Sequence, residues 1–201
     1  MYHFTGVDPQ TGLIAFEDKD NNGVGTNYPG DLQARKQITQ DYYGGLQNTV
    51  TYKGFQVSLF FQFVKQTGYS YIASPAFVVP GRKGNQMTDV LNRWQKPGDE
   101  SEYQMFTSSY ASKGSGLYSI STYAGDNSIT DASFIRLQNV YLAWSVSPPL
   151  MKRLHLKGGK VYAQGQNVLT WTKYKGLSPE TQSQTMLPPL RTITVGFQLS
   201  L

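Results

Sequence analysis

An acidic stretch near the N-terminus, DKDNNG, carries the clearest pattern of metal-binding residues in this sequence. Side-chain oxygens recur at every second position, from Asp18, Asp20 and Asn22, and Gly23 follows. An EF-hand loop begins with this spacing when it binds Ca²⁺. The position of the loop's bidentate glutamate is held by Pro29 instead. The stretch therefore predicts either a Ca²⁺ site at Asp18, Asp20 and Asn22 or a solvated turn in which these side chains bond the backbone.

Aromatic side chains in the long polar segments form a second group of candidate binding residues. Such rings can stack on sugars, and tyrosine and tryptophan are enriched at protein interfaces. The same side chains also pack a loop against itself, so both interpretations stay open. The candidates for contact with a substrate or partner are Tyr69, Tyr71, Phe77, Trp94, Tyr103, Tyr118 and Tyr123.

The sequence contains no recognisable arrangement of catalytic residues. The two histidines, His3 and His155, lie far apart, and no Ser-His-Asp arrangement, phosphate-binding loop or paired-carboxylate pattern stands out. A basic group between Lys152 and Lys160 suits an anionic lipid or a partner, or else an ordinary charged turn. The other Lys and Arg residues are scattered, so the net charge of +5 is weak evidence for nucleic-acid binding. We predict neither an enzyme nor a nucleic-acid-binding protein.

Alternation of apolar and polar residues indicates β-strands as the elements that position these groups. The chain has 201 residues, with 20 glycines, 14 tyrosines and 10 phenylalanines, and only 15% of its residues are charged. This composition favours β-structure. No run of about 18 apolar residues is present, so no transmembrane helix is expected. We predict an all-β fold with five antiparallel strands, near residues 43–52, 55–65, 133–146, 160–172 and 190–201.

One face of each predicted strand is apolar, with two exceptions, Phe60 on the polar side and Asn167 on the apolar side. The two-residue turn Lys53-Gly54 joins the first two strands in a hairpin. Strands of about ten residues match a tilted membrane crossing, whereas about five or six residues are usual in soluble sheets. We therefore expect the apolar faces to meet lipid. The predicted lipid-facing residues are Phe55, Val57, Leu59, Phe61, Phe63, Val140, Leu142, Trp144, Val146, Ile193, Val195, Phe197, Leu199 and Leu201.

Residues 1–42, 66–132 and 173–189 show little sustained periodicity and are predicted to be long loops. Such lengths are unusual between elements of a compact soluble domain. They fit a membrane barrel with long extracellular loops and short periplasmic turns. The connection 147–159, broken by Pro148 and Pro149, falls on the periplasmic side and is expected to contain a short helical turn. The N-terminus does not have the apolar stretch of a secretory signal.

Six stretches, in order over nearly the whole chain, resemble the C-terminal end of SusC/RagA-type, TonB-dependent outer-membrane transporters. They are TGVDPQTGLIAFEDKDNNG, YYGGLQNTVTYKGFQVSLFFQF, RWQKPGDE, DASFIRLQNVYLAW, GQNVLTWTKYKGLSPE and RTITVGFQLSL. The resemblance implies a transmembrane barrel of about 22 strands in the Gram-negative outer membrane. It also implies import of glycans, oligosaccharides or peptides, driven by TonB acting on an N-terminal plug that these residues do not include.

The resemblance further implies the partners of this segment. They are the remaining N-terminal barrel and plug of the same transporter, a SusD-type surface lipoprotein that forms a lid, and the lipids of the outer membrane. The segment would close the barrel wall and supply outer loops. The alternative is a soluble, secreted all-β carbohydrate-binding module. Fractionation with the outer membrane favours the transporter, whereas purification as a soluble monomer without detergent favours the module.

Overall fold

The computed structural model describes residues 1–33, 36–71, 79–183 and 185–200. The chain divides into two compact units. Unit 1 comprises Met1–Thr39, Thr67–Asp131 and Gln182–Met186, and unit 2 comprises Gln40–Gln66, Ala132–Thr181 and Leu187–Leu201. Two residues singled out by the sequence, Phe77 and Leu201, lie outside the described residues.

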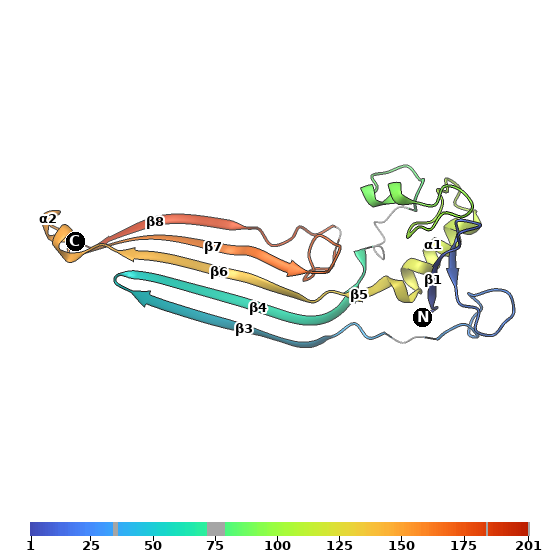
Figure 1. Ribbon diagram of the computed structural model, residues 1–201, viewed down its shortest axis with the longest axis horizontal. Helices are drawn as coiled ribbons and strands as arrows, with labels where there is room; N and C mark the ends of the chain where they lie inside the picture. The colour runs from blue at the N-terminus through green and yellow to red at the C-terminus, as the bar shows by residue number, and fades with distance from the viewer. Residues whose placement is uncertain (34–35, 72–78, 184, 201) are drawn as a thin grey trace. The chain divides into compact units, whose positions relative to one another are not determined.

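Unit 2 is built on five long antiparallel strands. They are β3 (Gln40–Tyr52), β4 (Phe55–Tyr69), β6 (Phe134–Ser145), β7 (Gly158–Thr172) and β8 (Thr192–Ser200). The strands lie side by side in the order β3-β4-β6-β7-β8, so each long strand pairs with the next one along the chain (Figure 1). The prediction of five antiparallel strands is confirmed.

The hairpin between β3 and β4 has the predicted two-residue turn. Lys53 and Gly54 have φ angles of 47° and 86°. A type I′ turn requires positive φ at both central residues, and its twist matches that of the flanking strands. Tyr52 and Phe55 are consequently direct partners in the strand register. The backbone N–H of Ser145 donates to the carbonyl of Gly54 at 2.8 Å, which joins this turn to the end of β6.

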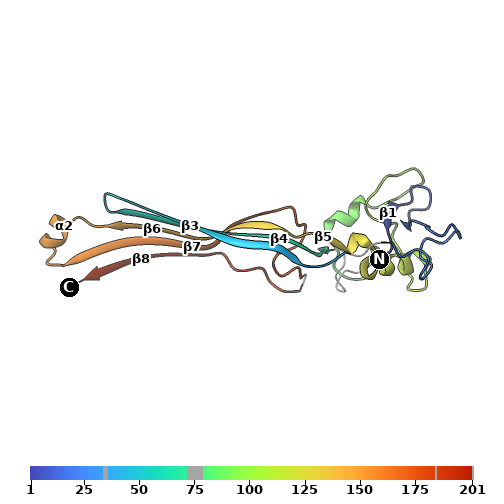
Figure 2. The same cartoon turned by 90° about the horizontal axis from the view of Figure 1, so that it is seen from below.

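A short helix, α2 (Pro148–Arg153), fills the connection between β6 and β7. It lies beyond the ends of the strands, as Figure 2 shows. Its Met151 is only 5% exposed and packs where a side chain on Gly159 of β7 would stand. The predicted short helical turn is confirmed at this place.

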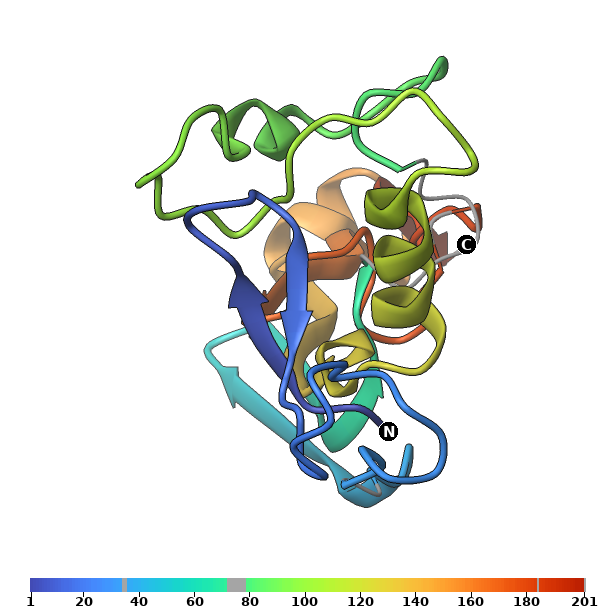
Figure 3. The ribbon, with the colours of Figure 1, turned by 90° about the vertical axis from the view of Figure 1, so that its right-hand side faces the viewer.

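Unit 1 holds the remaining elements: β1 (Phe4–Val7), β2 (Ile14–Phe16), the 3-10 helices η2 (Thr88–Asn92) and η3 (Asp126–Ser128), α1 (Lys113–Tyr123) and β5 (Ile129–Asp131). The strands β1 and β2 pair with each other, and α1 packs beside β2 (Figure 3). β5 pairs with the end of β4. The described residues of 1–42 and 66–132, which were expected to be long loops, contain these short strands and helices.

The helix α1 begins at a capped end. The side chain of Ser112, just before the helix, accepts a hydrogen bond from the backbone N–H of Ser115 at 3.2 Å. A serine at this position satisfies a backbone donor that the helix itself leaves unpaired. Among the described residues, no helix combines the length and the apolar character needed to cross a membrane.

Candidate functional site

The side chains of unit 2 line up in rows that cross the whole sheet. One row consists of Val50, Val57, Leu142, Ala163 and Val195, successive partners in the register and one from each strand. Residues paired in this way across antiparallel strands point to the same face. This row is wholly apolar, so one face of the sheet is apolar from β3 to β8.

The next rows on this face are also mainly apolar, with Asn48 as their one polar side chain. The row nearer the Lys53-Gly54 turn is Tyr52, Phe55, Trp144, Val161 and Phe197, and the row farther from it is Asn48, Leu59, Val140, Gly165 and Ile193. Phe61, Phe63 and Leu199 continue the face by strand alternation, and Val146 follows the end of β6. The predicted lipid-facing residues of the described sheet thus share one face, while their contact with lipid stays a prediction.

The opposite face of the sheet is mainly polar. Its rows are Thr49, Ser58, Tyr141, Gln164 and Thr194, and Thr51, Gln56, Ala143, Tyr162 and Gly196. The hydroxyl oxygens of Thr49 and Ser58 lie 2.9 Å apart and share a hydrogen bond. The rings of Tyr141 and Tyr162 stack with centroids 6.0 Å apart. This face offers hydroxyl, amide and aromatic groups to whatever lies against it.

The two exceptions noted in the sequence, Asn167 and Phe60, each have a local structural cause. Asn167 lies at a bulge where the β6–β7 register shifts, and it has a φ of 52°. Its side-chain amide donates to the carbonyl of Leu190 at 3.0 Å, so its polar group has a partner. Phe60, on the polar face, covers Gly45 of β3 so closely that a side chain at position 45 would collide with its ring.

Stacked aromatic pairs stand toward the two ends of the apolar face. Phe55 and Trp144 stack with centroids 6.1 Å apart beside the hairpin turn, and Phe61 and Trp171 stack at 6.4 Å farther along the strands. The eight residue-to-residue steps from Phe55 to Phe63 extend roughly 27 Å along a strand, or about 20 Å along the membrane normal when tilted. A transmembrane barrel has an apolar band about 25 Å tall, bordered by aromatic girdles.

Three of the candidate contact residues are buried inside unit 1. Tyr71, Tyr103 and Tyr118 are 5%, 7% and 5% exposed. The hydroxyl oxygens of Tyr71 and Tyr103 are 2.6 Å apart, and the Tyr71 hydroxyl donates to Asp89 at 3.3 Å. Burial raises the pKa of Tyr71, and the bond to Tyr103 adds to the shift. These rings pack the unit against itself, which leaves them no surface for a ligand in this conformation.

The other aromatic candidates differ in exposure. Trp94 is half-buried, with its ring beside Gly12 and its indole N–H donating to the carbonyl of Pro9 at 2.8 Å. Tyr69 and Tyr123 are 53% and 67% exposed. Tyr69, Tyr123 and the accessible part of Trp94 are therefore the described candidates that remain open to a partner or substrate.

The acidic stretch forms a carboxylate cluster with one member that its spacing did not predict. Oxygens of Asp18, Asp20 and Asp31 all lie within 4.8 Å of one another. Asn22 lies beside this cluster, since its side-chain Nδ2 donates to the Asp20 carboxylate at 3.1 Å while its side-chain oxygen accepts from the backbone N–H of Val24 at 2.8 Å. The predicted ligand set, Asp18, Asp20 and Asn22, stays a prediction, and Asp31 is a further carboxylate beside it. Ca²⁺ binding itself stays a prediction.

Asp31 is fully buried, and backbone donors surround its carboxylate. Its oxygens accept hydrogen bonds from the N–H groups of Lys19 at 2.8 Å, Asp20 at 3.4 Å and Asn27 at 2.7 Å. Burial alone would raise the pKa of Asp31, but these hydrogen bonds together hold it below its usual value. The backbone of this loop is therefore organised around the carboxylate of Asp31.

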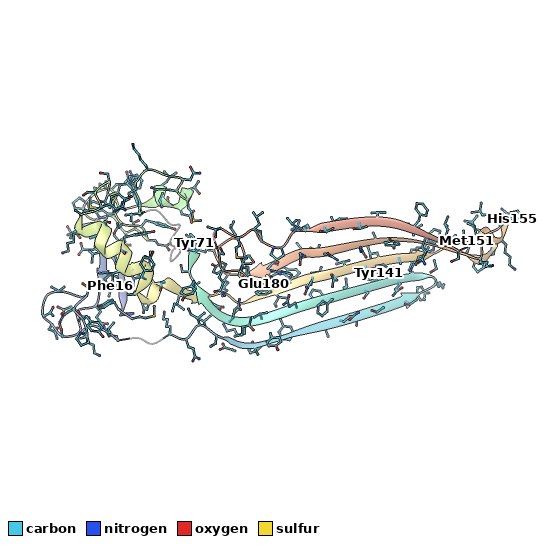
Figure 4. All side chains as sticks on the ribbon, turned by 180° about the vertical axis from the view of Figure 1, so that it is seen from behind. Phe16, Tyr71, Tyr141, Met151, His155 and Glu180 are labelled. Carbon is cyan, nitrogen blue, oxygen red and sulfur yellow. The ribbon has the colours of Figure 1, made fainter. Side chains whose placement is uncertain are left out.

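The sequence did not predict an ion pair that lies at the end of the sheet away from the Lys53-Gly54 turn. Arg136 of β6 is only 4% exposed, and its guanidinium lies 2.6 Å from the carboxylate of Glu180. Its Nε donates to the hydroxyl of Thr170 at 3.1 Å. Figure 4 labels Glu180 at this end and Met151 at the opposite end of the strands. Alternation from Val140 and Leu142 would place Arg136 on the apolar face, but a register shift between Phe60 and Phe61 turns it to the polar face opposite Gln62. The ion pair joins Glu180 to the sheet.

Comparisons with known proteins agree with this architecture. The TonB-dependent receptor P3 of Formosa agariphila is 25% identical to the chain over 214 residues, covering 96% of the chain and 19% of that receptor. The TonB-dependent receptor SusC of Bacteroides thetaiotaomicron is 32% identical over 166 residues, covering 82% of the chain and 15% of SusC. The chain thus spans less than a fifth of these curated relatives. No family model matches it.

Solved structures share the fold. The RagAB peptide transporter superposes with a TM-score of 0.71 at 23% identity, over 99% of this chain and 22% of the transporter chain. The RagAB peptide importer in its open-open state gives a TM-score of 0.70 at 21% identity. The relatives are receptors and importers rather than enzymes, and TonB-dependent receptors reside in the Gram-negative outer membrane. By its sequence matches and its fold, this chain is similar to one part of the SusC/RagA-type TonB-dependent receptors.

Proposed function

We propose that this chain forms part of the barrel wall of a TonB-dependent nutrient importer, as the C-terminal segment of that barrel. The observation that carries the proposal is the row from Val50 to Val195, which is apolar across all five strands. Lipid accepts only apolar side chains, whereas the interior of a large barrel accepts polar ones. The predicted lipid-facing residues then meet the membrane, and the Thr49-Ser58 row faces the lumen.

The two ends of the sheet face different compartments in this proposal. Outer-membrane barrels have short periplasmic turns and long extracellular loops. The Lys53-Gly54 turn and the α2 connection are the shorter links, so we assign them to the periplasmic side. The segments of unit 1 and the loop 173–189 are then extracellular. This assignment places Tyr69, Trp94 and Tyr123 on the side from which nutrients arrive.

The proposed cargo and partners of the receptor are drawn by analogy with its relatives. RagAB is named a peptide importer, and SusC is named a TonB-dependent receptor. By analogy we propose that the receptor carrying this chain imports peptides, oligosaccharides or glycans. A SusD-type lipoprotein would cover its extracellular side, and TonB would act on a plug elsewhere in the receptor. The exposed rings of Tyr69 and Tyr123 are candidate contacts for the lid or the cargo.

Fractionation of cells that express the complete receptor tests the proposal. The receptor should be recovered with the outer membrane and should migrate differently on a detergent gel with and without heating. A soluble carbohydrate-binding module is the alternative, and it would be recovered without detergent. The 73% and 74% exposures of Val195 and Phe197 argue against that module, since a soluble sheet covers its apolar face.

A further inference from the structure

The connection between β6 and β7 concentrates positive charge at one end of the sheet. Its basic residues are Lys152, Arg153, His155, Lys157 and Lys160, and the sequence has no Asp or Glu from 132 to 179. Lys152, Arg153 and Lys157 are exposed. The ion pairs found among the described residues involve other side chains. The side chains of Lys152, Arg153 and Lys157 are therefore available to an anion outside the chain.

Exposed leucines lie among these cations. Leu150 and Leu154 are 45% and 56% exposed. They are four residues apart, which places them on the same side of the helical turn. Their neighbour Met151 is buried against the sheet. In a solvated turn, two exposed leucines gain nothing from contact with water. A membrane interface accepts apolar side chains beside cationic ones.

The backbone holds this connection in one place. Leu156 N–H donates to the carbonyl of Met151 at 3.0 Å, and His155 has a φ of 56°, which together end α2 with a left-handed cap. Lys157 N–H donates to the carbonyl of Ser200 at 2.8 Å, which ties the connection to the end of β8. Figure 4 labels Met151 and His155 at this end of the strands. The cations are thus fixed next to the last residues of the apolar face.

We propose that residues 147–160 form an anchor that binds the anionic headgroups of phospholipids in the periplasmic leaflet. Lys152, Arg153 and Lys157 would contact the phosphates, while Leu150 and Leu154 enter the region below the headgroups. The inference rests on the proposed function, which puts the apolar face in lipid and this end of the sheet at the periplasmic surface. Cations close to an anionic membrane surface are attracted to it, and the attraction falls within a Debye length.

The test uses the complete receptor with a fluorophore on a single cysteine, reconstituted in phosphatidylcholine vesicles. The cysteine replaces Ser147, whose side chain makes no capping hydrogen bond. Spin-labelled phosphatidylglycerol or spin-labelled phosphatidylcholine, at equal mole fraction, serves as quencher. Phosphatidylglycerol should quench several-fold more strongly at low salt, and high salt should remove the excess. A fluorophore at Leu142→Cys reports separately whether the apolar face lies in lipid.

Charge variants identify which residues cause the stronger quenching by phosphatidylglycerol. The triple variant Lys152→Gln, Arg153→Gln, Lys157→Gln should make the two lipids quench equally, whereas Lys152→Arg, Lys157→Arg should keep the excess. Three exposed lysines elsewhere provide a matched control, Lys83→Gln, Lys96→Gln, Lys173→Gln, which should also keep it. Equal quenching by both lipids in the unsubstituted receptor, or an excess that survives the triple variant, overturns the anchor. An unquenched fluorophore at position 142 overturns the proposed function itself.

Discussion

The side-chain amide of Asn167 donates a hydrogen bond to the carbonyl oxygen of Leu190 at 3.0 Å. The bond joins the bulge of β7 to the segment that leads into β8. It requires the φ of 52° that Asn167 adopts, a left-handed conformation that asparagine tolerates better than most residues. A residue that looks misplaced in the strand pattern therefore fixes the path of the chain into its last strand.

Replacing Asn167 with leucine should destabilise the barrel, although it completes the apolar alternation. Leucine loses the hydrogen bond and strains the left-handed backbone, for a combined cost of about 2 kcal/mol. Asn167→Gly keeps the backbone and loses only the bond, at about 1 kcal/mol. Urea unfolding of the complete receptor measures both. A leucine variant as stable as the native receptor would refute this role for the bulge.

A charge on the apolar face should cost far more than a charge on the polar face. Leu59 pairs with Val140 on the apolar side, whereas its neighbour Ser58 pairs with Tyr141 on the other side. Leu59→Arg should cost about 2–4 kcal/mol if the residue lies near the bilayer midplane, and Ser58→Arg much less. Folding free energies in lipid vesicles test the difference. Equal costs, or the reverse order, would show that the assignment of faces is wrong.

The proposed topology predicts opposite labelling at two exposed positions. In intact cells without the lid lipoprotein, a membrane-impermeant maleimide should label Tyr123→Cys and spare Lys53→Cys. Position 123 lies in the unit assigned to the extracellular side and is 67% exposed, whereas position 53 lies in the hairpin turn. Permeabilising the outer membrane should make both react. Labelling of position 53 alone in intact cells would invert the topology.

Strand alternation predicted the sheet well because a one-residue slip would turn every apolar side chain to the wrong face. The same reasoning missed α1, whose buried residues are mostly small or polar: Gly114, Ser115, Tyr118, Ser121 and Thr122. It also missed Asp31, because its partners are the backbone N–H groups of a folded loop and follow no spacing. Alternation within each strand was therefore enough to predict the sheet. Unit 1 depends on contacts between residues far apart in the sequence, which local patterns do not reveal.

The ion pair of His3 with Asp126 predicts a pH-dependent attachment of β1. Their side chains are 2.8 Å apart, and Asp126 also accepts from the N–H of Phe4 at 2.9 Å. The hydrogen bond and the charge of Asp126 raise the pKa of His3 above 6.5. Burial by itself would raise the pKa of Asp126. The hydrogen bonds from Phe4 and His3 outweigh this effect and lower the pKa below 3.8.

The signs of these shifts fix the pH window. Because the pKa of His3 is raised in the folded state, its contribution to stability is complete below pH 6.5. This contribution is lost as the pH rises through the folded-state pKa. A lowered aspartate pKa stabilises above 3.8 and is lost as the pH falls through its folded-state value. Amide-exchange protection of residues 4–7 in the complete receptor should therefore decrease from mildly acidic to alkaline pH. His3→Gln should remove that decrease, and an unchanged decrease would assign it to another group.

The edges of the sheet predict that residues 1–201 alone do not form a functional pore. Among the described strands, β3 pairs only with β4 along its length and β8 only with β7, so each has one open edge. These strands have 13 and 9 residues. About half of their backbone groups point outward, and each left unsatisfied in hydrocarbon costs several kcal/mol. The sum exceeds the roughly 5–15 kcal/mol by which a typical protein is stable. Reconstituted alone, the chain should remain sensitive to protease and conduct no ions, whereas co-folding with the missing part of the barrel should protect it. A protease-resistant, ion-conducting monomer of these residues would show that the edges close without further strands.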